Sequence, residues 1–190
     1  WLASVLAEET FTLSVASADA SFRRYFRVHL ADRNLIAMDA PPQHENCQTF
    51  VDVAKLFLGC GLHVPEIIAQ NLEQGFLLLS DLGDETYLSK LTSDSAQALY
   101  SDASNALIKL QLASKPNVLP NYDAALLTRE MQLFPDWYIA QHLGVQLDGA
   151  QQSVLDKTFA VLTENILRQT QAFVHRDYHS RNLMVCDNNP

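Results

Sequence analysis

The sequence predicts an α+β fold of two lobes, a first lobe built on an antiparallel sheet and a second that is mostly helical. Two observations support this prediction. Apolar residues alternate with polar ones along much of the first 80 residues, and after residue 84 they recur at helical spacing instead. A chain of 190 residues with 48% hydrophobic and 18% charged residues is also large and apolar enough for one sizeable core or two small ones.

The first lobe is expected to contain five short strands and one helix. Three segments within the first forty residues alternate like strands and are separated by polar turns, at 11–15, 25–29 and 35–38. Residues 64–68 and 75–79 are expected to form two more strands. The first three are predicted to form an antiparallel meander, and the last two a hairpin around polar residues 70–74. The helix follows the third strand, after two prolines, and its apolar residues fall at helical spacing: Phe50, Val53, Ala54 and Phe57.

Residues after 84 predict helices, followed by a polar segment between two short strands. Three stripes of apolar residues at helical spacing mark the helices, from Leu99 to Leu110, Leu126 to Tyr138 and Val154 to Ile166. The short strands are expected at residues 172–174 and 183–185. The predicted domains are a first lobe over residues 1–80, a hinge over 81–84 and a helical lobe over 85–190.

Charge and hydropathy narrow the class of partner. The net charge of −9, with no basic run beyond Arg23-Arg24, opposes binding to nucleic acid or anionic lipid, because both reward clustered Lys and Arg. The longest apolar runs, such as residues 76–79, are far shorter than the ~20 residues of a membrane helix. We therefore expect a small-molecule partner, and neither a nucleic acid nor a membrane.

The cysteines indicate the compartment. Cys47, Cys60 and Cys186 include no Cys-x-x-Cys pair, which argues against a disulfide framework or a structural zinc site. We therefore expect a cytoplasmic protein. Cys60 and His63 have the spacing of metal ligands, but without a second pair they are interpreted as a small apolar residue and a loop imidazole. The oligomeric state stays open.

One polar segment matches a catalytic pattern: His175-Arg176-Asp177-Tyr178-His179-Ser180-Arg181-Asn182. Phosphoryl transfer requires an oriented acceptor hydroxyl, a group to accept its proton, and Mg²⁺ to neutralise the phosphates. In the pattern H-R-D-x-x-x-x-N, the Asp accepts the proton and the Asn binds the metal. Asp177 and Asn182 have this spacing between two predicted strands, so we expect Asp177 to be the catalytic base and Asn182 a metal ligand.

The second histidine of the segment narrows the resemblance. The pattern His-x-Asp-x-His-x-x-Asn resembles the aminoglycoside and small-molecule phosphotransferases more than the protein kinases, which share Arg176. The resemblance implies a protein-kinase-like two-lobed fold. His175 is interpreted as a residue that caps and packs the loop. His179 is either a hydrogen bonder that orients the loop or a residue near the phosphate, the metal or the substrate.

Other segments resemble a narrower group, the bacterial kinases that phosphorylate N-acetylmuramic acid and N-acetylglucosamine at the 1-hydroxyl. The matching segments follow one another along nearly the whole chain, at residues 18–28, 38–42, 78–83, 133–138 and 174–184. This resemblance implies ATP and Mg²⁺ as cofactors and an amino sugar of the cell wall as acceptor.

The same resemblance implies where the ligands bind. Residues 18–24, with Ser21, would replace the loop that covers the phosphates. The hinge that hydrogen-bonds adenine would be the backbone of three residues, Ser80, Asp81 and Leu82. The acceptor sugar would lie over the helical lobe, against the side chains of Glu130, Trp137 and Tyr138. A core position is the alternative for Trp137.

Two departures from the pattern concern the nucleotide phosphates. The covering loop has no glycine, and no lysine precedes residue 55, so Met38-Asp39 stands where the strand lysine is expected. We expect Arg23 or Arg24 to supply the missing cation, since alternation puts Arg24 on the strand face of Phe26, from which it could reach back. An exposed arginine pair is the alternative.

The end of the chain is a third departure. A kinase needs a second metal-binding Asp about ten or more residues past the Asn, but the sequence stops at Pro190, and Asp187 follows Asn182 too closely. We therefore expect a truncated helical lobe, with the second metal-binding Asp beyond residue 190.

Three hypotheses about function follow. The first is an ATP-dependent kinase of a cell-wall amino sugar, and the second is a kinase of an aminoglycoside, choline or another small alcohol. The third is a nucleotide-binding protein without turnover, motivated by the missing lysine and the missing Asp. Other classes are excluded because the sequence has no Gly-x-x-x-x-Gly-Lys-Ser/Thr loop, no Gly-x-Gly-x-x-Gly and no Gly-x-Ser-x-Gly elbow.

Overall fold

The computed structural model describes residues 1–7, 10–18 and 22–186 of the chain. Contacts between Cα atoms divide the chain into two compact units, Trp1–Ala113 with Val174–Pro190, and Ser114–Phe173. The first unit holds a sheet and helices, and the second is helical. The predicted α+β class is confirmed, whereas the division into residues 1–80, 81–84 and 85–190 stays a prediction.

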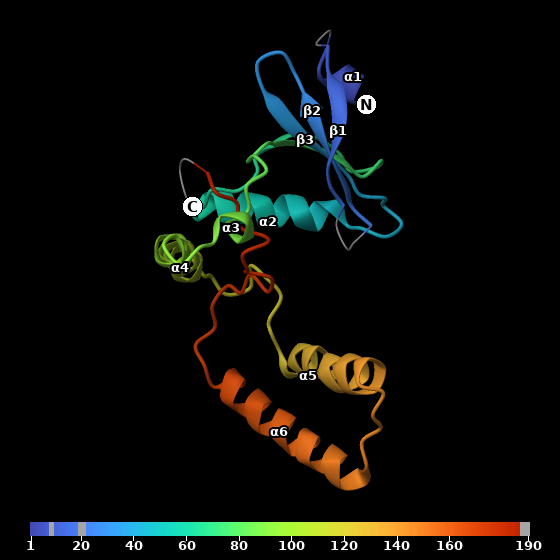
Figure 1. The fold of residues 1–190 in the computed structure, drawn as a ribbon, viewed down its shortest axis with the longest axis vertical. Helices are drawn as coiled ribbons and strands as arrows, with labels where there is room; N and C mark the ends of the chain where they lie inside the picture. Colours follow the sequence, from blue (N-terminus) through green and yellow to red (C-terminus); the bar gives the residue numbers. More distant parts are fainter. Residues whose placement is uncertain (8–9, 19–21, 187–190) are drawn as a thin grey trace. The chain divides into compact units, whose positions relative to one another are not determined.

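A five-stranded antiparallel sheet forms the centre of the first unit (Figure 1). Its strands are β1 (Thr12–Ala18), β2 (Arg24–His29), β3 (Asn34–Asp39), β4 (Ile67–Asn71) and β5 (Phe76–Ser80). They lie in the order β1-β2-β3-β5-β4, and every neighbouring pair is antiparallel. The predicted meander and hairpin both form, and the hairpin joins the meander through the pairing of β5 with β3.

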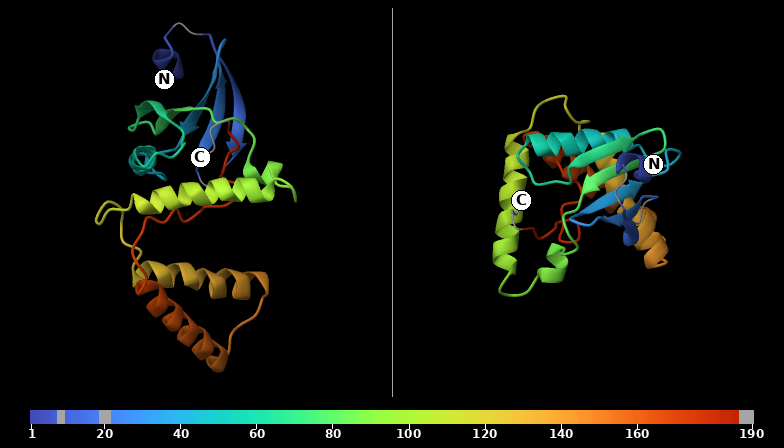
Figure 2. Two further views of the ribbon diagram at one scale, coloured as in Figure 1. Left: turned by 90° about the vertical axis from the view of Figure 1, so that its left-hand side faces the viewer. Right: turned by 90° about the horizontal axis from the view of Figure 1, so that it is seen from above.

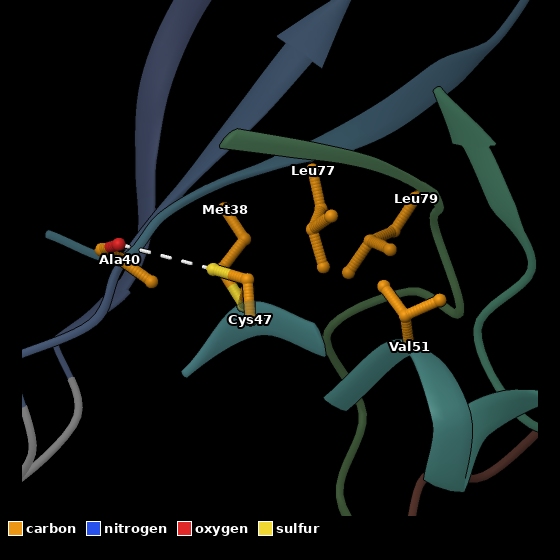
Figure 3. Packing of buried hydrophobic residues seen from close by; sticks show 6 residues of the cluster. All are labelled: Met38, Ala40, Cys47, Val51, Leu77 and Leu79. Atoms are coloured by element: carbon orange, nitrogen blue, oxygen red, sulfur yellow. Dashed lines mark hydrogen bonds between the residues drawn. The ribbon is translucent and has the colours of Figure 1, made fainter. Parts of the chain in front are cut away.

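One face of the sheet packs against α2 (Cys47–Gly59). Met38 of β3 and Leu77 of β5 meet Val51 of α2 in a core whose side chains point toward one another in Figure 3. The helix begins at Asn46, whose side chain accepts hydrogen bonds from the next backbone N–H groups and so replaces the partners missing in the first turn. The predicted helix is thereby confirmed.

The other face of the sheet carries α1 (Leu2–Val5), a helix that the sequence analysis does not predict. Leu35 and Ala37 of β3 point to this face, beside Leu6 and Leu78. Because successive side chains of β3 point to opposite faces of the sheet, this strand contributes residues to both cores. A helix of four residues is too short to show a hydrophobic period of its own, which is why the sequence pattern misses it.

Strand β4 begins later than predicted, at Ile67 rather than residue 64. Pro65 has no N–H to donate to a ladder, and pairing with β5 starts where Ile67 lies opposite Leu79. The turn is shorter too, because the Asn71 side chain accepts a hydrogen bond of 3.0 Å from the N–H of Gln74. The predicted turn at 70–74 is wrong for its first two residues, which belong to β4.

Two helices of the first unit make a third core with the C-terminal segment. The helices are α3 (Tyr87–Lys90) and α4 (Ala96–Leu112). Residues 174–186 run beside α4, as Figure 2 shows in its left view. The core joins side chains from all three elements, including Tyr87, Leu99, Ala103, Tyr178 and Leu183.

The two short strands predicted around the polar segment do not form. Residues 172–174 pair with no strand among the residues described, and the N–H of Phe173 donates to Ser114 Oγ at 2.8 Å. Residues 183–185 make one isolated antiparallel bridge, between Met184 and Thr86. An apolar triplet becomes a strand only where a neighbour completes its ladder. Among the described residues, 172–174 have no such neighbour, and 183–185 have only the single bridge to Thr86.

The second unit consists of α5 (Ala124–Leu133), the π-helix η1 (Phe134–His142) and α6 (Gly149–Leu167). After η1 the chain turns back, and α6 contacts α5 (Figure 1). The predicted stripe that ends at Tyr138 therefore changes from α to π geometry at Phe134. Pro135 explains the change, because it removes an N–H and crowds the preceding turn of an α-helix.

Helix α6 matches the third predicted stripe and begins with a capping box between Asp148 and Gln151. Several of its apolar side chains are exposed, Val154 to 66% and Val161 to 64%. Within residues 1–7, 10–18 and 22–186, no helix combines the length and the hydropathy needed to cross a membrane.

Gly75 is predicted to be essential for the fold. It has φ +77°, and a Cβ atom there would clash with the Ala40 carbonyl. We expect Gly75→Ala to lower the free energy of unfolding by about 2–5 kcal/mol, because it adds backbone strain to a steric clash. Gly59→Ala, where the described residues leave open space, should be neutral or stabilise by up to about 1 kcal/mol. Denaturant titration compares the two, and equal effects would contradict the prediction.

Candidate active site

The first unit contains a cavity of about 1150 Å³, large enough for a nucleotide-sized ligand. Its wall includes the α2-facing side of the sheet, α2 itself, the chain after β5, α4, and the segment from His175 to Cys186. Seven residues singled out from the sequence lie in this wall: Arg23, Ser80, Asp81, Leu82, Asp177, His179 and Asn182. The fold thus brings together one cluster from three separate stretches of sequence.

Asp177 and Asn182 are in direct contact. The Asn182 Nδ2 donates to Asp177 Oδ2 at 2.5 Å and to the Asp177 carbonyl at 3.1 Å, which closes the intervening loop. The Asp177 side chain is 69% exposed, so the carboxylate is accessible from the cavity. Because Nδ2 is turned toward Asp177, the amide oxygen is the atom of Asn182 left for a cation.

His179 holds the second carboxylate oxygen of Asp177. Its Nε2 lies 3.0 Å from Asp177 Oδ1, and its Nδ1 accepts the N–H of Arg181 at 3.2 Å. Since Nδ1 is the acceptor, the proton of the neutral ring is on Nε2, which donates to the carboxylate. This geometry fits the role of a loop-orienting hydrogen bonder, with each Asp177 oxygen held by a different side chain.

Tyr178 anchors the loop to the core. Its hydroxyl donates to the Ala103 carbonyl of α4 at 2.7 Å, and burial raises the pKa of this phenol, aided by nearby Tyr87. The N–H of Leu88 also donates to the Ser180 carbonyl at 2.9 Å. The Tyr178 side chain packs against the third core, whereas the preceding residue, Asp177, lies in the cavity wall. Arg176 has φ +74°, a strained conformation that costs about 1–3 kcal/mol for a residue with a side chain.

His175 lies between two rings. The Phe57 ring of α2 is 5.7 Å away and the Tyr178 ring 5.1 Å away, measured between centroids. Burial lowers the pKa of His175, with His179 acting in the same direction and Asp177 opposing it. Its buried Nδ1 has no hydrogen-bond partner among the described residues. These contacts agree with the interpretation of His175 as a packing residue of the loop.

The chain after β5 is tied to its neighbours. The N–H of Ser80 donates to the Glu66 carbonyl and the Ser80 hydroxyl accepts the N–H of Glu66, both at 2.9 Å. The Asp81 side chain is 7% exposed and pairs with Arg27 of β2. The Leu82 carbonyl accepts a hydrogen bond from Cys186 Sγ at 3.5 Å, so the backbone groups of the hinge left to face a ligand are those of Asp81 and the N–H of Leu82. Arg27 escapes the sequence analysis, because no motif marks an arginine within a strand.

The two arginines before and at the start of β2 lie in different environments. Arg23 forms an ion pair of 2.9 Å with Glu45, and its guanidinium lies 6.0 Å from the Phe50 ring centroid. Burial acts to lower the pKa of Arg23, but its hydrogen bonds to Glu45 and Tyr25 outweigh burial and raise the pKa. Glu45, a residue that no motif marked, therefore orients the Arg23 side chain without itself lining the cavity.

Arg24 has a different set of neighbours. It pairs with Asp39 of β3, lies over the Phe26 ring and is 66% exposed. Phe26 belongs to the core on the α1 side of the sheet, whereas the cavity wall uses Tyr25 from the opposite side of β2. The predicted strand alternation is correct, but it turns Arg24 to the face that does not line the cavity.

Four predicted site residues remain, namely Ser21, Glu130, Trp137 and Tyr138. Ser21 lies outside the described residues. Glu130 and Trp137 belong to the second unit, in α5 and η1, and the Trp137 side chain is 66% exposed rather than in a core. Tyr138 of η1 stacks between Phe134 and His142. An acceptor role for these side chains stays a prediction.

Comparison with known sequences finds a phosphotransferase family and three relatives that share one name. The model of the phosphotransferase enzyme family matches residues 12–190. A protein from Pseudomonas aeruginosa named N-acetylmuramate/N-acetylglucosamine kinase is 54% identical over 175 residues, which cover 92% of this chain and 52% of that protein. Proteins of the same name from Pseudomonas putida and Neisseria meningitidis are 47% and 37% identical, over 94% and 100% of this chain and 53% and 58% of their own. The chain thus spans a little over half the length of these relatives.

Two solved structures share the fold. The gentamicin complex of APH(2")-IIa has a TM-score of 0.58 at 13% identity, over 98% of this chain and 64% of that one. An aminoglycoside-3'-phosphotransferase of type VIII has a TM-score of 0.55 at 12% identity, over 94% and 66%. At such identities the likeness concerns the fold alone, and it confirms the predicted protein-kinase-like architecture.

The lowered pKa of His175 predicts a pH effect on stability. A histidine in the unfolded chain binds a proton near pH 6.5, whereas folded His175 binds it only at lower pH, so stability falls as pH drops below 6.5. We expect His175→Gln to make the free energy of unfolding fall less steeply between pH 7 and 5. The two slopes should differ by less than the about 1.4 kcal/mol per pH unit that the uptake of one full proton contributes, since water screens the partly exposed ring. Denaturant titrations with the same slope in both proteins would contradict this.

Proposed function

We infer the function from one premise: this chain belongs to the phosphotransferase enzyme family. We propose that the intact protein transfers the γ-phosphoryl group of ATP to the anomeric hydroxyl of N-acetylmuramic acid or N-acetylglucosamine. The observation that carries the phosphotransferase proposal is the contact of Asp177 with Asn182 in the wall of a nucleotide-sized cavity. The names of relatives at 54%, 47% and 37% identity support the choice of acceptor.

Asp177 acts as the base in this proposal. The acceptor hydroxyl gives its proton to the Asp177 carboxylate while its oxygen bonds to the γ-phosphorus, and the bond from phosphorus to ADP breaks. His179 and Asn182 each hydrogen-bond one oxygen of the Asp177 carboxylate, which lowers the entropic cost of orienting the base. Proton transfer of this kind contributes about 10²- to 10⁴-fold to the rate.

The hinge and Arg23 would hold the nucleotide. Adenine would meet backbone groups of Asp81 and Leu82, next to Ser80 at the end of β5. Arg23 would face the phosphates in place of the missing strand lysine, because its guanidinium is in the cavity wall and is oriented by Glu45. Ser21 in the covering loop keeps its predicted role as part of this proposal.

The residues present fit a magnesium ion. Mg²⁺ takes few protein oxygens and completes its octahedron with nucleotide phosphates and water, so the Asn182 amide oxygen is a suitable ligand. Among the described residues, this site included, no group of three or more His, Cys, Asp or Glu side chains could hold a metal. The ion would neutralise phosphate charge during transfer. We further propose a cytoplasmic location, which suits ATP and three cysteines, Cys47, Cys60 and Cys186, that form no disulfide among the described residues.

Phosphorylation of a panel of acceptors tests the proposal. We expect the intact protein to consume ATP with N-acetylglucosamine and N-acetylmuramic acid, and not with choline or an aminoglycoside. The 1-O-methyl glycosides of the same sugars should be inert, because they lack the free anomeric hydroxyl. ³¹P NMR of the product identifies the phosphorylated position.

Two variants serve as controls for this assay. Asp177→Asn should lower kcat by about 10²- to 10⁴-fold and keep its affinity for ATP, since only proton acceptance is lost. Asp52→Asn, which changes an exposed carboxylate on α2, should behave like the wild type. Phosphate on a methyl glycoside, or turnover with choline alone, would overturn the choice of acceptor. Full activity of Asp177→Asn would overturn the role of the base.

Matched substitutions can distinguish the contributions of Arg23 and Arg24 to nucleotide binding. We expect Arg23→Met to raise the Kd for Mg-ATP by about tenfold or more, the value of one charge-assisted hydrogen bond. Arg24→Met should change it less than about twofold, because Arg24 pairs with Asp39 on the other strand face. Isothermal titration calorimetry measures both. The opposite ranking would assign the cation to Arg24.

A further inference from the structure

A single arginine of β2 binds the chain that follows β5. Arg27 Nε donates to Asp81 Oδ2 at 2.6 Å and Nη2 donates to Asp81 Oδ1 at 3.2 Å. The same Nη2 donates to the Gly83 carbonyl at 2.9 Å. The guanidinium is 18% exposed and the Asp81 carboxylate 7%, so this is a largely buried, bidentate pair rather than a surface contact.

The contacts close residues 81–83 into a compact turn. Asp81 Oδ1 also accepts the N–H of Gly83 at 2.9 Å, and Gly83 has φ +89°, a backbone conformation that suits glycine. The N–H and the carbonyl of Gly83 are therefore both held, the first by Asp81 and the second by Arg27. On the other side of the turn, Ser80 is joined to Glu66.

Arg27 reaches this turn across the sheet. In the register of the strands it lies opposite Ile36, which lies opposite Leu79, and both of these side chains line the cavity. Arg27 itself is not in the cavity wall, whereas Asp81, Leu82 and Gly83 are. The arginine thus acts on a ligand only through the backbone that it holds.

We propose that Arg27 is a positioning residue that fixes the base-binding backbone and so makes the site select adenine over guanine, an inference that rests on the proposed function. Adenine offers a donor and an acceptor where guanine offers an acceptor and a donor. A rigid pair of backbone groups can match only one of these patterns, because the other leaves buried groups unpaired. A peptide that was free to rotate would accept both bases.

Binding of nucleotides to Arg27 variants tests the proposal. In the intact protein, Arg27→Met should raise the Kd for ATP by about tenfold and leave the Kd for GTP nearly unchanged, so that the preference for ATP shrinks. Inorganic tripolyphosphate, which has no base, should bind all variants alike. Arg27→Lys keeps the charge but cannot make the forked contact, so it should also lose base preference. Arg33→Met, an exposed arginine of the β2–β3 turn that pairs with Asp32, is the matched control.

The outcomes are distinct. A wild-type ratio of ATP to GTP affinity in Arg27→Lys, or an equal loss for ATP and tripolyphosphate, would overturn the inference but not the proposed function. Failure of the wild type to bind either nucleotide would overturn both. Circular dichroism shows whether Arg27→Met is folded, and if it is not, the Arg27→Lys variant decides alone.

Discussion

The hydrogen bond from the Tyr178 hydroxyl to the Ala103 carbonyl is the contact on which the candidate site depends. The segment that carries Asp177 and Asn182 has no ladder of its own beyond one bridge, so regular secondary structure does not position it. The core under α3 and α4 does so instead, because Tyr178 and Leu183 enter it. With those side chains fixed in the core, the neighbouring polar residues Asp177, His179 and Asn182 lie in the cavity wall.

The positive charge of the site is arranged in an unusual way. The inward position of β3 carries Met38, 1% exposed in the core against α2, and that position cannot supply a cation. On our proposal the cation is Arg23, which precedes β2 and is oriented by Glu45. A net charge of −9 makes such local pairing important, because the overall field of the chain repels phosphates.

The chain after β5 is held from two directions. Ser80 is bound to Glu66 on the β4 side, and Asp81 and Gly83 are bound to Arg27 on the β2 side. These contacts use the polar side chains of the turn and leave backbone groups toward the cavity. A site that recognises a ligand through backbone gains affinity from this kind of preorganisation, since little conformational freedom remains to be lost on binding.

The strand alternation, the order of the five strands around α2 and the spacing of Asp177 and Asn182 can be predicted from the sequence, because each depends on residues close together in the chain. The tertiary structure decided that Arg23 rather than Arg24 faces the cavity, that Glu45 pairs with Arg23, and that Arg27 pairs with Asp81 after β5. It also decided that the triplet 172–174 is not a strand, since its outcome depends on a neighbour. Pairings between distant residues follow from packing, which no local pattern encodes.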